Sequence, residues 1–207
     1  TLGVTTTQPE RSALTHRHTP LVGAYTTYLQ GAQHIEKETE DTYTLARAFL
    51  SAAIDLDPAY APAHAGLAWS YLHENHGDKN HVNVERNLKK ALSIDDALPE
   101  AHLLKARLAL SRHQHQRGVT AVERALELRP NYAAGYAFLA NLTGLMGRPK
   151  DALGNIEKAM RLHPRFPSSF LTLLGHLYRM LGRNRDAILL LRRAQGQDPQ
   201  STRCYLQ

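Results

Sequence analysis

Cysteine is almost absent from this sequence of 207 residues, in which Cys204 is the single one. An intramolecular disulfide framework is therefore excluded. The compartment stays open between cytoplasm and periplasm, because a helical protein needs no disulfides in either place. No run of 18 uncharged apolar residues is present, so the sequence predicts no membrane-spanning helix.

Motifs of common active sites are missing as well. The sequence has no glycine-rich phosphate loop, no H-E-x-x-H zinc motif and no G-x-S-x-G nucleophile motif. Cys204 falls in a tail after the last periodic segment. The sequence therefore predicts a protein that is not an enzyme and that needs no cofactor.

A repeated spacing is the strongest positive feature. A small residue is followed by an apolar residue four positions on, by alanine three further on, and by proline five further on. The windows are Ala46-Leu50-Ala53-Pro58, Gly118-Val122-Ala125-Pro130, Ala152-Ile156-Ala159-Pro164 and Ala187-Leu191-Ala194-Pro199. A fifth window, Val84-Leu88-Ala91-Asp96, keeps the spacing without the proline. Consecutive windows end 38, 34, 34 and 35 residues apart, which indicates a repeat array.

This period resembles the tetratricopeptide repeat, a helix–turn–helix unit of about 34 residues. Leu67-Ala68-x-x-Tyr71 and Leu174-Gly175-x-x-Tyr178 fit part of its signature. The resemblance covers about residues 23–201 and implies an all-α fold, a right-handed α-solenoid of about five repeats. We expect the repeats at about 23–60, 61–98, 99–132, 133–167 and 168–201. Residues 1–22 are expected to form an extended leader or linker, and residues 202–207 a tail or the start of a truncated helix.

A narrower resemblance covers residues 17–68. The stretches Arg17-His18-Thr19-Pro20, Ala24-Tyr25-x-x-Tyr28-Leu29-x-Gly31 and Ala53 to Ala68 resemble the start of the repeat region in bacterial multi-domain signalling proteins. Those proteins join an adenylate/guanylate cyclase domain or a winged-helix DNA-binding domain to a C-terminal repeat array. The resemblance implies that this chain is the sensory or regulatory segment of such a protein. That role is the alternative to a free-standing binding module.

The first helix of each repeat is expected to carry the binding residues. Repeat positions 2, 5, 9 and 12 share one helical stripe, because their spacings follow the helical period. The partner-binding groove predicted from this stripe contains Tyr25, Tyr28, Trp69, Arg107, Asn141, His176 and Arg179. Such a groove would hold a peptide or a partner domain. The alternative is that Trp69 and the tyrosines pack between helices.

Positive charge is concentrated near the C-terminus. Residues 143–207 contain 11 Lys and Arg against 4 Asp and Glu. This surplus predicts an acidic partner, although a solvated surface has the same composition. Nucleic acid is not expected, because the basic residues Arg148, Lys150, Arg183 and Arg185 fall on predicted turns and no nucleic-acid motif accompanies them.

Two further features leave alternatives open. Among twelve histidines, His73, His76 and His81 cluster where a four-residue insertion lengthens the second repeat. They are weak candidates for zinc or copper ligands, and an exposed polar loop is the simpler interpretation. The apolar run Ile188–Leu191 lies in the last repeat, so we expect a homodimer through the C-terminal end or coverage of that end by the tail.

Overall fold

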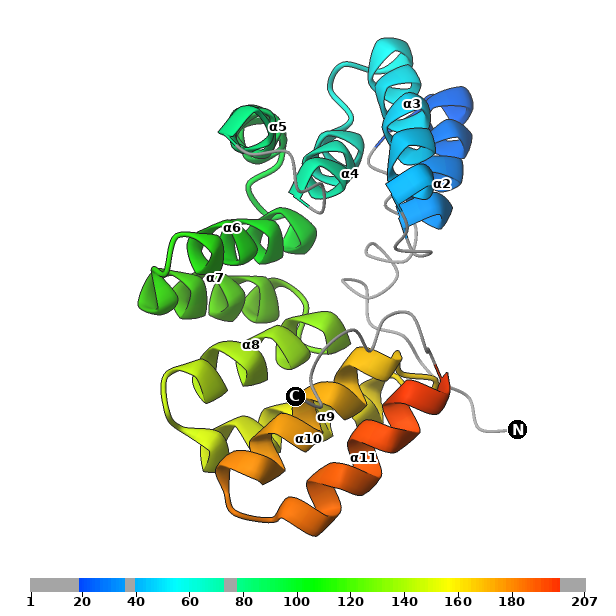
Figure 1. Cartoon of the computed structure of the whole chain (residues 1–207). Coiled ribbons are helices and arrows are strands. Elements are labelled where there is room, and N and C mark those ends of the chain that lie inside the picture. Colours follow the sequence, from blue (N-terminus) through cyan, green and yellow to red (C-terminus); the bar gives the residue numbers. More distant parts are fainter. Residues whose placement is uncertain (1–18, 36–39, 73–77, 198–207) are drawn as a thin grey trace, which may run out of the picture. The chain divides into compact units, whose positions relative to one another are not determined.

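The computed structural model describes residues 19–35, 40–72 and 78–197, and in these ranges it contains ten α-helices and no strand (Figure 1). The helices are α2 (Val22–Ile35), α3 (Glu40–Leu56), α4 (Ala61–Leu72), α5 (Asp78–Ile94), α6 (Pro99–Ser111), α7 (His115–Leu128), α8 (Ala133–Leu145), α9 (Pro149–Leu162), α10 (Ser168–Met180) and α11 (Asn184–Gln197). None of them, within the described ranges, combines the length and apolarity needed to cross a membrane.

The chain divides into two compact units, residues 1–98 and residues 99–207. Unit 1 contains the pairs α2–α3 and α4–α5. Unit 2 contains the pairs α6–α7, α8–α9 and α10–α11, and in both units each pair packs against the next pair of the same unit. The core of each unit therefore runs between successive helix pairs, as it does in a repeat array.

The repeated windows form the buried face of the second helix in each pair. In α9, Ala152, Ile156 and Ala159 are all completely buried. The corresponding residues of α3, α5, α7 and α11 are buried as well. Because the window spacings of four and three follow the helical period, one narrow apolar stripe provides the contact with the first helix.

Each first helix has a small residue where the second helix crosses it. Gly175 in α10 faces Leu191 in α11, and a Cβ atom added to Gly175 would lie 2.9 Å from Leu191 Cγ. Gly31 has the same relation to Leu50, at 2.8 Å. Alanine occupies the equivalent position in the other pairs, as Ala68, Ala106 and Ala140, each with an exposed fraction of 0%. A larger side chain at these points would push the two helices apart.

The three turns inside the helix pairs of unit 2 have the same backbone geometry. In each turn a backbone N–H donates to the carbonyl five residues earlier, as Gln114 to Ala109 (2.9 Å), Arg148 to Thr143 (3.1 Å) and Arg183 to Tyr178 (2.9 Å). Such a turn requires one residue with positive φ. Gly147 and Gly182 supply it at φ 76°, and His113 supplies it at φ 56°.

The residues just before α2 contact the end of α3. The Thr19 hydroxyl donates to the Asp57 carboxylate, and it accepts a hydrogen bond of 3.1 Å from the backbone N–H of Leu21. Thr19 is buried, and α2 begins at Val22. Within the predicted leader, Thr19 is therefore packed against the end of α3, whereas Leu21 and Val22 are exposed. The rest of that leader, residues 1–18, and the predicted tail, residues 202–207, lie outside the described residues.

Replacing Gly175 with leucine tests the helix crossing. The new side chain would overlap Leu191, so we expect Gly175→Leu to lower the free energy of unfolding by roughly 1–3 kcal/mol. Gly154→Leu is the matched control, because Gly154 lies within α9 and has no atom within 4 Å of its added Cβ. That change should raise the free energy of unfolding by roughly 0.5–1 kcal/mol through helix propensity. Urea titration measures both, and equal effects would contradict the close crossing.

His113→Gly tests the turn before α7. The left-handed conformation costs a non-glycine residue roughly 1–2 kcal/mol, whereas the greater freedom of glycine in the unfolded chain offsets about 0.5–1 kcal/mol of this gain. We therefore expect a net stabilisation of up to about 1 kcal/mol. Gly182→Ala is the opposite change in the equivalent turn before α11, and it should lower the free energy of unfolding. Thermal melts of the two variants should shift in opposite directions, and a shift in the same direction would be inconsistent with this geometry.

Candidate functional site

The predicted groove residues are divided between the two units. Tyr25 and Tyr28 lie on α2 and Trp69 lies on α4, all in unit 1. The other members belong to unit 2, as Arg107 on α6, Asn141 on α8, and His176 and Arg179 on α10. The two sets form two candidate binding surfaces, one on each unit.

In unit 1 the two tyrosines contribute to packing. Tyr28 meets Tyr60 edge to face, with ring centroids 5.2 Å apart. Tyr25 and Tyr28 both pack against a buried cluster that contains Tyr60, and both keep part of their surface exposed. Burial, with smaller contributions from Tyr28, Tyr25 and Asp57, raises the pKa of the Tyr60 phenol. Trp69 is half-buried on α4. This surface is therefore aromatic and is anchored by its own packing.

In unit 2 the residue at stripe position 9 of each first helix directly follows the small residue at which the two helices cross. Arg107 follows Ala106, Asn141 follows Ala140 and His176 follows Gly175. Adjacent residues on a helix point about 100° apart, so each of these side chains begins beside the buried crossing and extends from it. All three are half-buried. The crossing thus determines both the position and the partial burial of the stripe.

Arg107 is oriented by an aromatic ring that the sequence analysis did not include. Its guanidinium carbon lies over the ring of Phe138 in α8, 5.0 Å from the ring centroid. Phe138 itself is buried, with 7% of its surface exposed. A cation over an aromatic face is attracted by the ring quadrupole. Phe138 lies three residues before Asn141 on the same helical face, and this spacing is the signal that could have identified it.

His176 has a perturbed titration. Burial lowers the pKa of the His176 imidazole below its usual range, and the nearby charge of Arg179 lowers it further. Arg179 is exposed one turn further along α10. The imidazole is therefore neutral at neutral pH, when it can donate one hydrogen bond and accept another.

Glu100, which occupies position 2 of the stripe, forms an ion pair. Its Oε1 lies 2.6 Å from Nη1 of Arg129, and both side chains are about 40% exposed, at 39% and 40%. The Arg129 guanidinium also lies over the ring of Tyr132 at 5.0 Å. This pair joins α6 to Arg129, the residue that follows α7. The repeat period does not predict a contact between these two positions. The positive charge of Arg129 neutralises Glu100, which is the one carboxylate at the stripe positions of unit 2.

Solved structures of known proteins share this architecture. A thermophilic tetratricopeptide-repeat protein of Thermus thermophilus matches with a TM-score of 0.68 and 18% identity, over 86% of this chain and 92% of that chain. PilF of Pseudomonas aeruginosa matches with a TM-score of 0.63 and 18% identity, over 84% of this chain and 76% of that chain. The chain has the tetratricopeptide-repeat fold. The predicted all-α solenoid of helix–turn–helix repeats is confirmed.

A third tetratricopeptide-repeat structure is that of YrrB, described as having an unusual peptide-binding site. It matches with a TM-score of 0.51 and 17% identity, over 92% of each chain. No family model matches the sequence, and no curated protein matches it significantly. At these identities the matches establish the tetratricopeptide-repeat fold alone.

The predicted metal site is only partly within the described residues. His81 lies exposed on α5, whereas His73 and His76 fall in the range 73–77 that is not described. In the part of the chain that the structure describes, no group of three or more His, Cys, Asp or Glu side chains is placed to hold a metal ion. The three-histidine site stays a prediction.

Arg179→Gln tests the electrostatic coupling on α10. Removing the like charge should raise the pKa of His176, while burial should still hold this pKa below the usual value for histidine. Titration of the imidazole C–H signals by NMR measures the change. Arg161→Gln removes an equally exposed cation from α9 and should leave the His176 titration unchanged. An identical curve for Arg179→Gln and the wild type would show that the two side chains do not interact.

Proposed function

We propose that unit 2 binds an acidic, extended segment of a partner protein along the first-helix stripe of α6, α8 and α10. The observation that carries the proposal is the row of Arg107, Asn141 and His176 at one repeat position, each half-buried beside a helix crossing. Arg179 adds a second cation at the end of the row. This tetratricopeptide-repeat unit would then act as a protein-interaction module.

The chemistry of the row suits a chain of carboxylates and backbone amides. A guanidinium can donate two parallel hydrogen bonds to one carboxylate, and the side-chain amide of Asn141 can pair with a peptide backbone as donor and acceptor. Because Arg107 already lies over Phe138, less side-chain freedom is lost when a ligand binds. The basic surplus of residues 143–207 would speed the association of an acidic segment.

Unit 1 supports the proposal through different residues. Tyr25, Tyr28 and Trp69 each keep part of their surface exposed, and aromatic side chains of this kind are enriched in protein interfaces. We assign them contacts with apolar side chains of a partner. A peptide-binding site is also part of the description of YrrB, which has the same fold.

Two other predictions stay open. A sensory or regulatory role within a cyclase or winged-helix protein depends on the resemblance of residues 17–68. The predicted homodimer through the C-terminal end depends on the apolar run Ile188–Leu191, of which Leu190 and Leu191 turn towards the interior. Light scattering over a concentration series tests that dimer.

The predicted absence of catalysis and of cofactors likewise stays a prediction.

Selection of peptides from a random display library on the purified chain tests the proposal. We expect enriched peptides to be acidic, and we expect Arg107→Ala to weaken their binding by about tenfold, or roughly 1.4 kcal/mol. Arg124→Ala on α7 is the control, because it removes an exposed cation from outside the stripe. Unfolding stability should change little for either variant.

The same peptides provide a pH test. Protonation of His176 adds a positive charge beside Arg179, so affinity for an acidic peptide should rise as the pH falls through the lowered pKa of His176. His176→Gln should abolish the rise. Selected peptides that are neutral or basic, or that bind Arg107→Ala as tightly as the wild type, would refute the proposed stripe.

A further inference from the structure

The outer side of α11 carries an amphipathic pattern that the stripe does not use. Arg185, Ile188, Leu189 and Arg192 have the spacing i, i+3, i+4 and i+7, which places them on one side of the helix. We name these four residues the α11 face. Ile188 is 45% exposed and Leu189 is 66% exposed, and both arginines are exposed as well. The opposite side of α11, with Ala187, Leu191 and Ala194, is buried.

The equivalent positions of α9 show which residues of the α11 face have a packed counterpart. Leu153 is the residue that follows the first window position in α9, and it packs against a core cluster to which α8, α9 and α10 contribute. Ile188 has the same place in α11. The next residue in α9 is Gly154, which is exposed with nothing within 4 Å of an added Cβ, whereas α11 has Leu189 there. Ile188 therefore repeats a position at which α9 packs against its neighbours, and Leu189 adds a second apolar side chain at a position that is exposed in α9.

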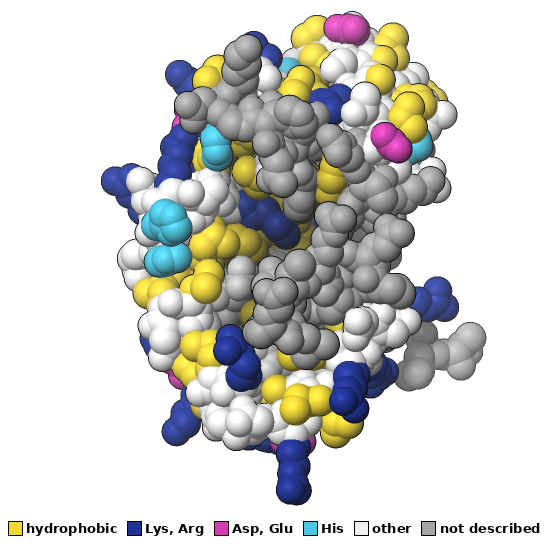
Figure 2. Space-filling model, in the orientation of Figure 1, with side chains coloured by type: hydrophobic (Ala, Val, Ile, Leu, Met, Phe, Trp, Pro, Cys, Tyr) yellow, Lys and Arg dark blue, Asp and Glu magenta, His cyan; other side chains and the backbone are white. Residues whose placement is uncertain are grey.

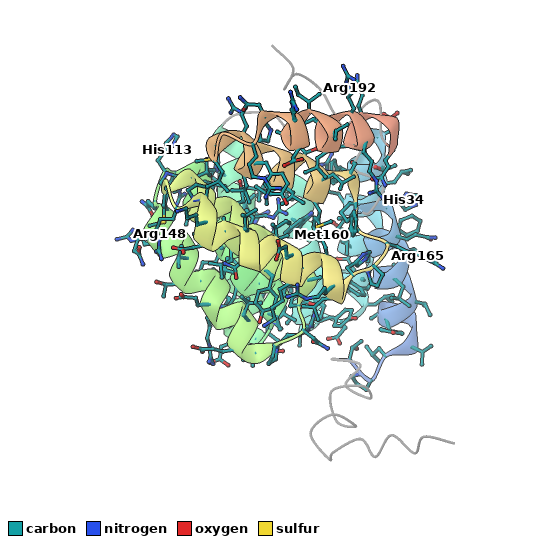
Figure 3. The ribbon with its side chains drawn as sticks, turned by 90° about the horizontal axis from the view of Figure 1, so that it is seen from below. His34, His113, Arg148, Met160, Arg165 and Arg192 are labelled. Atoms are coloured by element: carbon teal, nitrogen blue, oxygen red, sulfur yellow. The ribbon has the colours of Figure 1, made fainter. Side chains whose placement is uncertain are left out.

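The two charged residues of the α11 face are both arginines. The carboxylate of α11 is Asp186, which pairs with Arg183 at 2.8 Å. Across the described residues, no carboxylate lies within ion-pair distance of Arg185 or Arg192. Figure 3 shows Arg192 projecting away from the surrounding helices. In Figure 2 the region of α8–α11 displays more Lys and Arg side chains than Asp and Glu side chains.

These observations determine the chemistry of the occupant. We propose that the α11 face binds an amphipathic helix of a partner protein that carries acidic residues one turn before and one turn after an apolar centre. The apolar centre would cover Ile188 and Leu189, and the acidic residues would pair with Arg185 and Arg192. This site is separate from the stripe of Arg107, Asn141 and His176, and it does not depend on the function proposed for that stripe.

A second copy of the chain fits this surface poorly. In a two-fold pairing of α11 faces, each face meets itself, so the arginines of the two copies would lie next to one another. Like charges placed together in an interface oppose association. The residues that follow α11, 198–207, contain one carboxylate, Asp198, and one arginine, Arg203, so their composition is not acidic either. An acidic helix is the occupant that complements both the apolar and the charged residues.

The test uses the full chain and a synthetic helical peptide of about five turns, roughly 18 residues. The peptide has a leucine pair at its centre and glutamates one turn to each side, and its binding is measured by fluorescence anisotropy at low ionic strength. We expect the double variant Arg185→Glu, Arg192→Glu to bind at least about tenfold more weakly. A peptide with lysine in place of glutamate should recover binding to that variant. Leu189→Glu should also lose binding without a change in melting temperature, because this side chain is exposed.

A matched control separates this site from general charge effects. Arg161→Glu reverses one exposed charge on α9 and should bind the acidic peptide like the wild type. The proposal is wrong if the wild type does not bind the acidic peptide, if Arg161→Glu loses as much affinity as the double variant, or if the lysine peptide fails to rescue. Binding to phosphatidylserine-containing vesicles without peptide binding would assign the surface to a membrane instead. Concentration-dependent dimerisation abolished by Leu189→Glu would assign it to a second copy.

Discussion

The close crossing of the two helices in each pair is the constraint on which the rest of the structure depends. At each crossing the first helix presents glycine or alanine, and the second helix fills the space with Leu50, Leu88, Val122, Ile156 or Leu191. The spacing is so tight at Gly175 that an added Cβ would lie 2.9 Å from its neighbour. Alanine and glycine are poor sources of buried apolar area. They are used here because they allow the branched side chain opposite to be buried completely.

This constraint also positions the candidate binding residues. In unit 2, Arg107, Asn141 and His176 each follow the small residue of a crossing, so the tightest part of the unit holds the backbone from which they extend. In unit 1, Trp69 follows Ala68 in the same way. The turns at Gly147 and Gly182 join the helices of a pair through backbone hydrogen bonds. A row of side chains on such a frame loses little freedom on binding. Repetition of one unit therefore produces a surface whose chemistry varies while its geometry is conserved.

Local pairing decides which charges remain for partners. At the start of α9, Arg148 pairs with Asp151 at 2.7 Å, and at the start of α11, Arg183 pairs with Asp186 at 2.8 Å. Each carboxylate lies in the first turn of its helix, where it also interacts favourably with the helix dipole. Exposed pairs of this kind contribute little to stability. Their effect is to neutralise Asp151 and Asp186, while Arg179, Arg185 and Arg192 are exposed to a partner.

The sequence by itself determined the repeat architecture and the buried stripe of each second helix, because both depend on local periodicity, and the window residues are buried as that periodicity predicts. It also placed the stripe residues on the first helices. Only the tertiary structure decided how those residues are held. The stacking of Arg107 on Phe138 joins α6 to α8, the pairing of Glu100 with Arg129 joins α6 to the residue after α7, and burial lowers the pKa of His176. These contacts depend on side-chain directions and on the distances between packed helices, which a period of about 34 residues does not specify.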